Sequence, residues 1–140
     1  MSRIIINQLG PIQSCDLEID EFMVFTGPQS SGKSTIAKSV FLFKNVKNIL
    51  VQLLRKQHLL SEGAVSSTIG MSLKNRLIRE LRSNFLQIFG TTWCMDHNMS
   101  LKYEYREDVW IQIALKSDQM SPNYIWLEFS QRLIDFLGEL

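Results

Sequence analysis

The sequence contains few of the features that mark secreted or membrane proteins. Its 140 residues include only two cysteines, Cys15 and Cys94, which lie far apart and form no CxxC pair. This pattern argues against a disulfide scaffold and against a zinc module. The apolar runs are only a few residues long, whereas a membrane-spanning helix needs about 20, and Met1-Ser2-Arg3 does not begin a signal peptide. We therefore expect a cytoplasmic protein that does not enter a membrane.

The composition nevertheless supplies enough apolar material for a core. Hydrophobic residues make up 45% of the chain and charged residues 21%, which is typical of a globular protein. Domains usually have roughly 100–200 residues. We therefore treat residues 1–140 as one domain, or as a fragment of a larger one.

Charge is unevenly distributed, although the net charge is only +1. Between residues 22 and 79 one acid, Glu62, stands against nine basic residues: Lys33, Lys38, Lys44, Lys47, Arg55, Lys56, Lys74, Arg76 and Arg79. Such a separation can mark an anionic partner, for example a nucleotide or a nucleic acid. A solvated basic face next to an acidic one explains it equally well.

The N-terminal third predicts three strands and the start of a helix. Residues 3–9 are rich in isoleucine and end at the turn-forming pair Gly10-Pro11. Apolar and acidic residues then alternate over residues 15–20, as in a strand with one solvent-exposed face. The apolar run Phe22–Phe25 predicts a central strand covered on both faces. From residue 34 to about residue 60, apolar residues recur at steps of three and four, which predicts one long helix.

The rest of the chain predicts a second helix and further strands. Ser72 is a suitable N-cap for a helix that would stop near Gly90. Residues 101–106 and 109–116 are expected strands. Residues 124–140 are ambiguous, and one interpretation is a strand to Phe129 followed by a helix.

One segment carries recognisable chemistry. Gly27-Pro28-Gln29-Ser30-Ser31-Gly32-Lys33-Ser34 matches G-x-x-x-x-G-K-[ST], the phosphate loop or Walker A motif. The two glycines allow the backbone to turn tightly and to approach the phosphates closely. The amide groups of the loop would then form an anion-binding nest at the positive end of the following helix. Residues 27–35 are therefore the expected ATP-binding segment.

Three side chains of this segment have separate expected roles. Lys33 would place its ammonium group on the β- and γ-phosphates, and Ser34 would offer its hydroxyl to Mg²⁺. Thr35 would cap the helix or pack nearby. The expected cofactors are thus ATP and Mg²⁺, with Ser34 as the metal ligand.

A family resemblance extends this interpretation. The run from Ile4 to Ile12, continued by Phe25-Thr26-Gly27-Pro28 and Lys33-Ser34-Thr35, resembles the N-terminal lobe of ABC-type ATPases. These are AAA-family proteins related to chromosome-maintenance and double-strand-break-repair heads. The resemblance is specific over residues 3–43. It implies an α/β fold, in which a P-loop NTPase core carries an N-terminal antiparallel β ribbon and is incomplete in this chain.

The sequence also departs from that family. Gln29 and Ser30 stand where the family usually has asparagine and glycine. No Walker B strand ending in Asp-Glu and no Leu-Ser-Gly-Gly signature is identifiable, so the catalytic residues stay unknown. Four weaker matches each have a simpler structural interpretation: Tyr124–Glu128 and Leu133–Asp135 as Walker B strands, Leu60–Gly63 as a signature, and Gln131 as the family's glutamine loop.

Three functions remain open on these grounds. The first is an ATP·Mg²⁺-binding lobe of an ABC-type ATPase, which would hydrolyse ATP only with a complementing C-terminal lobe or second subunit. The second is a non-catalytic ATP-binding interaction or decoy module. The third is a small P-loop kinase. A nucleic acid is a possible further partner, because Arg76, Arg79 and Arg82 recur at threefold spacing, although a solvated helix face explains that spacing more simply.

Overall fold

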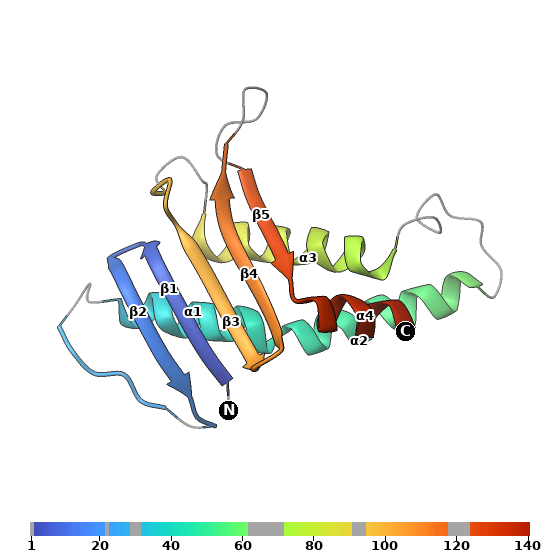
Figure 1. Ribbon diagram of the computed structural model, residues 1–140, viewed down its shortest axis with the longest axis horizontal. Coiled ribbons are helices and arrows are strands. Elements are labelled where there is room, and N and C mark those ends of the chain that lie inside the picture. Colours follow the sequence, from blue (N-terminus) through green and yellow to red (C-terminus); the bar gives the residue numbers. More distant parts are fainter. Residues whose placement is uncertain (1, 22, 29–31, 62–71, 91–94, 118–123) are drawn as a thin grey trace.

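The strands pair into one antiparallel sheet, and buried side chains alternate with more exposed ones along most of their length. The computed structural model describes residues 2–21, 23–28, 32–61, 72–90, 95–117 and 124–140. Within these ranges the sheet has the order β2-β1-β3-β4-β5 (Figure 1). The strands are β1 (Ser2–Leu9), β2 (Ile12–Ile19), β3 (Ser100–Arg106), β4 (Val109–Lys116) and β5 (Tyr124–Phe129). The α/β class and the N-terminal antiparallel ribbon are thus confirmed.

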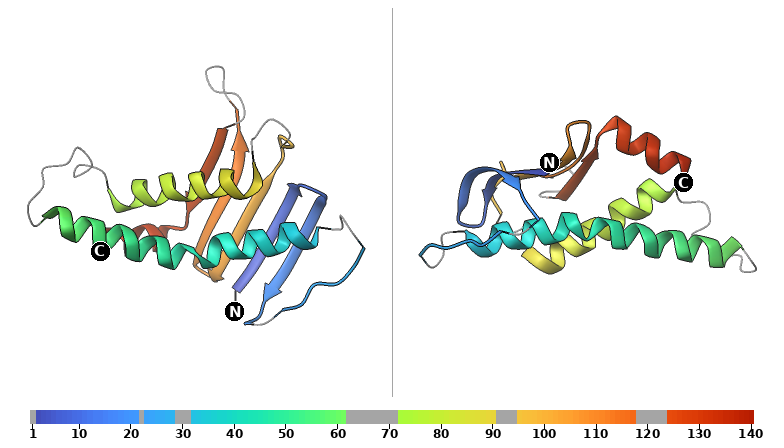
Figure 2. Two further views of the ribbon diagram at one scale, coloured as in Figure 1. Left: turned by 180° about the vertical axis from the view of Figure 1, so that it is seen from behind. Right: turned by 90° about the horizontal axis from the view of Figure 1, so that it is seen from below.

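Helices cover one face of this sheet. They are α1 (Lys33–Lys44), α2 (Val46–Ser61) and α3 (Leu73–Phe89), and a fourth helix, α4 (Gln131–Glu139), follows β5 at the edge of the sheet. Figure 2 shows α1, α2 and α3 as a layer beneath the strands, with the other face of the sheet open. In the described part of the chain, no helix is both long and apolar enough to span a membrane.

The long helix expected over residues 34–60 is divided in two. Asn45 interrupts it, but its backbone remains near-helical: its N–H donates to the carbonyl of Phe41 at 3.0 Å, and its own carbonyl accepts from Ile49 N–H at 3.1 Å. The prediction for α3 is confirmed at both ends. The Ser72 side chain accepts a hydrogen bond from Asn75 N–H at 3.2 Å, and Gly90 ends the helix with a φ of 83°.

The core lies between the sheet and the helical layer. Phe43 of α1 is fully buried and stacks on Tyr103 of β3, with 5.2 Å between ring centroids. The hydroxyl of Tyr105 donates to the carbonyl oxygen of Phe43 at 2.6 Å, so one buried polar contact also joins the two layers. The other fully buried large side chains are Ile4, Ile6, Leu42, Leu77, Leu81, Phe85, Met99, Leu101, Ile111 and Ile113.

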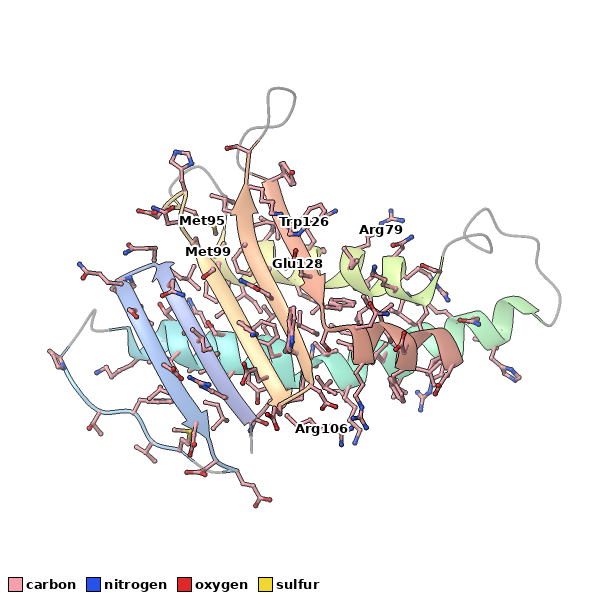
Figure 3. The ribbon with its side chains drawn as sticks, viewed as in Figure 1. Arg79, Met95, Met99, Arg106, Trp126 and Glu128 are labelled. Carbon is pink, nitrogen blue, oxygen red and sulfur yellow. The ribbon has the colours of Figure 1, made fainter. Side chains whose placement is uncertain are left out.

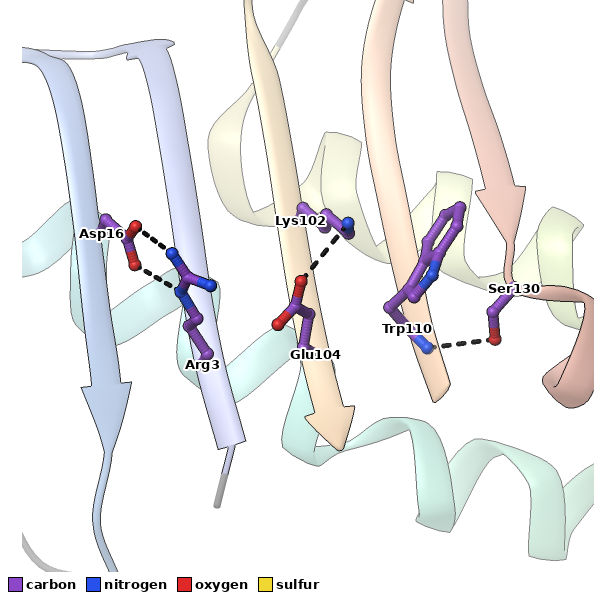
Figure 4. A network of polar contacts seen from close by, with 6 residues as sticks. All are labelled: Arg3, Asp16, Lys102, Glu104, Trp110 and Ser130. Carbon is purple, nitrogen blue, oxygen red and sulfur yellow. Dashed lines mark hydrogen bonds and ion pairs between the residues drawn. The ribbon is translucent and has the colours of Figure 1, made fainter. Parts of the chain in front are cut away.

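The open face of the sheet is polar and mixed in charge. Figure 4 shows an ion pair between Arg3 and Asp16 and another between Lys102 and Glu104, whose charged atoms are 3.3 Å apart. Lys102 also lies 4.6 Å from the ring centroid of Trp110. Because each of these cations already has a partner on the same face, this surface offers little unpaired positive charge.

The strand expected at residues 22–25 is not formed. Residues 23–27 belong to neither a helix nor a strand, and Val24 is 71% exposed. Phe22 lies outside the described residues. A strand in the middle of a sheet needs a hydrogen-bonded neighbour on each side, and none of the described strands pairs with this segment. The expectation of a buried strand that leads into the phosphate loop is therefore wrong, and the described residues show no P-loop NTPase core.

Candidate functional site

Gly32 joins the phosphate-loop segment to the N-terminal hairpin. It is the N-cap of α1 and has a φ of 100°, in the left-handed region that favours glycine. It is also buried, and a Cβ atom at this position would lie 2.6 Å from Cγ1 of Ile12, the first residue of β2. The β1–β2 turn therefore packs directly on the start of α1. Neither the turn-forming pair Gly10-Pro11 nor the phosphate-loop motif indicates this contact, which only the tertiary structure creates.

Lys33 connects the two ends of the phosphate-loop segment. It is the first residue of α1, and its Nζ donates a hydrogen bond to the carbonyl oxygen of Gly27. Gly27 has a φ of 151°, a second position in the loop where a side chain would be unfavourable. An incoming anion would compete with the Gly27 carbonyl for this ammonium group.

Ser34 and Thr35 have different surroundings. Ser34 is exposed, so its hydroxyl is accessible to a metal ion. Thr35 is half-buried, and a Cβ atom at Gly10 would lie 3.2 Å from its Oγ1, so it packs beneath the hairpin turn. Its carbonyl oxygen accepts a hydrogen bond from the hydroxyl of the buried Ser39 at 2.7 Å. Thr35 therefore packs the first turn of α1 against the hairpin, whereas the Ser34 side chain remains accessible to solvent.

The start of α1 is electropositive. The first hydrogen bond of the helix runs from Ile36 N–H to the carbonyl of Gly32 at 3.0 Å, so the amides that precede Ile36 have no acceptor within the helix. No acidic residue lies in the first turn. The helix dipole and the free amides consequently favour an anion here, and the dipole alone is worth about 0.3–1 kcal/mol per charge when exposed.

Part of the expected site lies outside the described residues, namely Gln29, Ser30 and Ser31. The described members of the segment are Gly27, Pro28, Gly32, Lys33, Ser34 and Thr35. They bring together the two glycines, the lysine and the hydroxyl that the motif requires. Gly27, Pro28 and Ser34 are all exposed.

The weaker ATPase matches do not join this site. Glu128 lies on β5, the edge strand opposite β2, and is paired in register with Gln112 (Figure 3). Asp135 is on α4, where its Oδ1 accepts a hydrogen bond from Gln131 Nε2 at 2.9 Å. Figures 1 and 2 place α4 and the N-terminus of α1 at opposite ends of the molecule. Glu128 and Asp135 are therefore not Walker B residues in this arrangement, and Gln131 is an exposed helix residue.

Two further expectations concern the signature-like segment and the arginines. Glu62 and Gly63 of the signature-like segment lie outside the described residues. Of the three arginines of α3, Arg79 and Arg82 are exposed (Figure 3). Arg76 is half-buried, and its Nη2 donates to Oε1 of Gln57 on α2 at 2.6 Å. Because Arg76 joins two helices, it serves the packing of the helical layer, and the three arginines do not form one free basic stripe.

Comparison of this chain with protein-family models, with curated proteins and with solved structures finds no match.

Proposed function

We propose that the chain binds ATP·Mg²⁺ through residues 27–35 and acts as the N-terminal lobe of an ABC-type ATPase. The observation that carries this proposal is the contact between Lys33 Nζ and the Gly27 carbonyl at the glycine-capped start of α1. Lys33 and the free amides of α1 would hold the β- and γ-phosphates, and the exposed Ser34 hydroxyl would hold Mg²⁺.

Hydrolysis is expected only after a complementing C-terminal lobe joins this one. The sequence offers no identifiable Walker B acid, and a positioned general base contributes about 10²–10⁴-fold to a rate. The unpaired apolar segment at residues 23–25 supports the same idea. Its backbone would become the central strand if a partner supplied the neighbouring strands. Phe41 on α1, which is 62% exposed, is a further apolar side chain that such a partner would cover.

The direct test is Lys33→Ala, measured by titrating the chain with MgATP in a calorimeter. A hydrogen bond to a charged group is worth about 1.5–3 kcal/mol, so the affinity should fall roughly 10–100-fold. The matched control is Lys38→Ala, an exposed lysine on the same helix, which should bind as the parent chain does. Circular dichroism should be unchanged in both variants. Equal ATP affinities for Lys33→Ala and the parent chain would refute the proposal.

Two other functions would share this nucleotide site. A non-catalytic ATP-binding interaction or decoy module predicts MgATP binding with no turnover, whatever lobe is added. A small P-loop kinase predicts that labelled γ-phosphate moves to an acceptor molecule. A complementing lobe that raises the release of inorganic phosphate would favour the ATPase lobe over both.

A further inference from the structure

A second surface, remote from the phosphate loop, is unusually apolar. An open cavity of about 730 Å³ lies between α2 and α4, beside the β3–β4 turn, and Leu50, Val51, Leu54 and Phe136 contribute to its lining. A second cavity of about 520 Å³ continues along α2 to Leu59 and shares Val51 and Leu54 with the first. Together they form one groove, which we call the α2–α4 groove.

The exposed apolar side chains of the molecule gather at this groove. Eight large hydrophobic side chains are exposed among the described residues, and four of these line the groove. Those four are Val51 at 41%, Leu59 at 68%, Phe136 at 50% and Leu140 at 48% exposure. Contiguous apolar surface of this kind marks an interaction site rather than an ordinary solvated face.

The two sides of the groove carry opposite charge. Lys44, at the end of α1, and Lys47, on α2, line one side, whereas Asp135 and Glu139 of α4 line the other. All four side chains are exposed, and within the described part of the chain none of them forms an ion pair. The charge of Arg132 on α4, by contrast, is already compensated by Asp108 at the β3–β4 turn.

We propose that the occupant of the α2–α4 groove is a second copy of this chain, related to the first by a two-fold axis. In a two-fold contact the same surface patch of each subunit faces the other, so the patch must contain both a surface that protrudes and the surface that receives it, and charges of both signs. Here α4 is an amphipathic helix with an apolar ridge at Phe136 and an acidic edge, and the α2 side supplies an apolar floor with a basic edge.

Each copy would place its α4 against the partner's α2. Phe136 would enter the apolar floor formed by Val51 and Leu54, while Asp135 and Glu139 would meet the partner's lysines. This arrangement buries the exposed apolar side chains of the groove and also pairs its acidic side chains with the partner's lysines. It does not depend on nucleotide binding, because none of the described residues of segment 27–35 lines the groove, and α4 lies well away from the N-terminus of α1 (Figures 1 and 2).

The first experiment is sedimentation analysis of the full chain over a series of concentrations. The parent chain should form dimers, and Phe136→Asp should weaken the dimer at least tenfold. Phe136 is half-exposed, so this change should leave the circular dichroism spectrum intact. Phe41→Asp is the matched control, because Phe41 is exposed on α1 outside the groove, and this variant should dimerise as the parent chain does.

The second experiment reverses the charges one side at a time. Asp135→Lys with Glu139→Lys makes both sides basic, and Lys44→Glu with Lys47→Glu makes both sides acidic. Like charges placed together cost several kcal/mol, so each double variant alone should dimerise at least tenfold more weakly than the parent chain. A mixture of the two double variants restores attraction at both contacts and should form a heterodimer.

Three results would overturn the proposal. These are a parent chain that is monomeric at every concentration, a dimer that Phe136→Asp leaves intact, and a mixture of charge variants that fails to associate. A monomeric chain whose groove binds an apolar fluorescent dye, with Phe136→Asp abolishing the binding, would assign the groove to a small amphiphile or to another protein instead.

Discussion

Two apolar runs near the N-terminus have similar sequences and opposite outcomes. Ile4–Ile6 lies in β1, which is paired with β2 on one side and β3 on the other, and Ile4 and Ile6 are fully buried. Met23–Phe25 is just as apolar, but it pairs with no described strand, and Val24 is 71% exposed. Strand propensity is therefore not sufficient, and the availability of neighbours on both sides decides which run becomes a strand.

This difference also separates the paired strands of the fold from a segment that pairs with none of the described strands. The antiparallel sheet and the helical layer bury each other's apolar faces. In the link from β2 to α1, which contains the phosphate-loop segment, Val24 is exposed, whereas Met23 is partly buried against the core. A partner that supplied neighbouring strands would allow residues 23–25 to pair as residues 4–6 already do.

The largest expected effect concerns the two runs themselves. Ile6→Ala should lower the free energy of unfolding by about 2–5 kcal/mol, because it leaves a cavity beneath the sheet. Val24→Ala should change it by less than about 0.5 kcal/mol, as at other exposed positions. Urea denaturation of both variants measures these values. A loss at Val24 comparable with that at Ile6 would mean that the second run is packed after all.

A smaller effect is expected where the link meets the hairpin. Gly32→Ala should cost about 1–3 kcal/mol, because a side chain is strained at a φ of 100° and its Cβ would press on Ile12. Gly90→Ala is the matched control. Its φ of 83° is also positive, but no atom lies within 4 Å of the added Cβ, so backbone strain alone applies there, without the clash that Gly32→Ala adds. Urea denaturation measures both losses of stability, and equal losses for Gly32→Ala and Gly90→Ala would show that the contact with Ile12 adds no cost at position 32.

The smallest effect concerns the polar contact within the completed layer. Tyr105→Phe removes the hydrogen bond to the Phe43 carbonyl and should cost about 0.5–1.5 kcal/mol at neutral pH. Burial also raises the pKa of Tyr105 above its usual range. The unfolded phenol loses its proton near pH 10 and the folded one does not, so rising pH favours the unfolded state.

The alkaline loss of stability gives this prediction a second measurement. Unfolding free energies determined in urea between neutral pH and about pH 11 should fall more steeply for the parent chain than for Tyr105→Phe, because only the parent has this phenol to ionise. Parallel pH profiles for the two proteins would contradict the assignment of the slope to Tyr105.

The local features of the fold were predictable from short stretches of sequence. Isoleucine content and the Gly10-Pro11 turn signal located β1, and alternation located β2. Ser72 and Gly90 marked the ends of α3, and the glycine–lysine pattern located the start of α1. Each of these signals depends on residues within a few positions of one another, whose backbone preferences act without help from the rest of the chain. The break at Asn45 was not predictable in this way, because apolar spacing continues through it.

The sequence by itself determined most of the helices and strands, the phosphate-loop motif and the α/β class, since backbone conformation and apolar periodicity are local properties of the chain. Only the tertiary structure decided that Ile12 packs on Gly32, that residues 23–27 remain unpaired, and that α2 and α4 leave an apolar groove between them. These features depend on contacts between segments that are distant in sequence, and a pattern read along one segment contains no information about its neighbours in space.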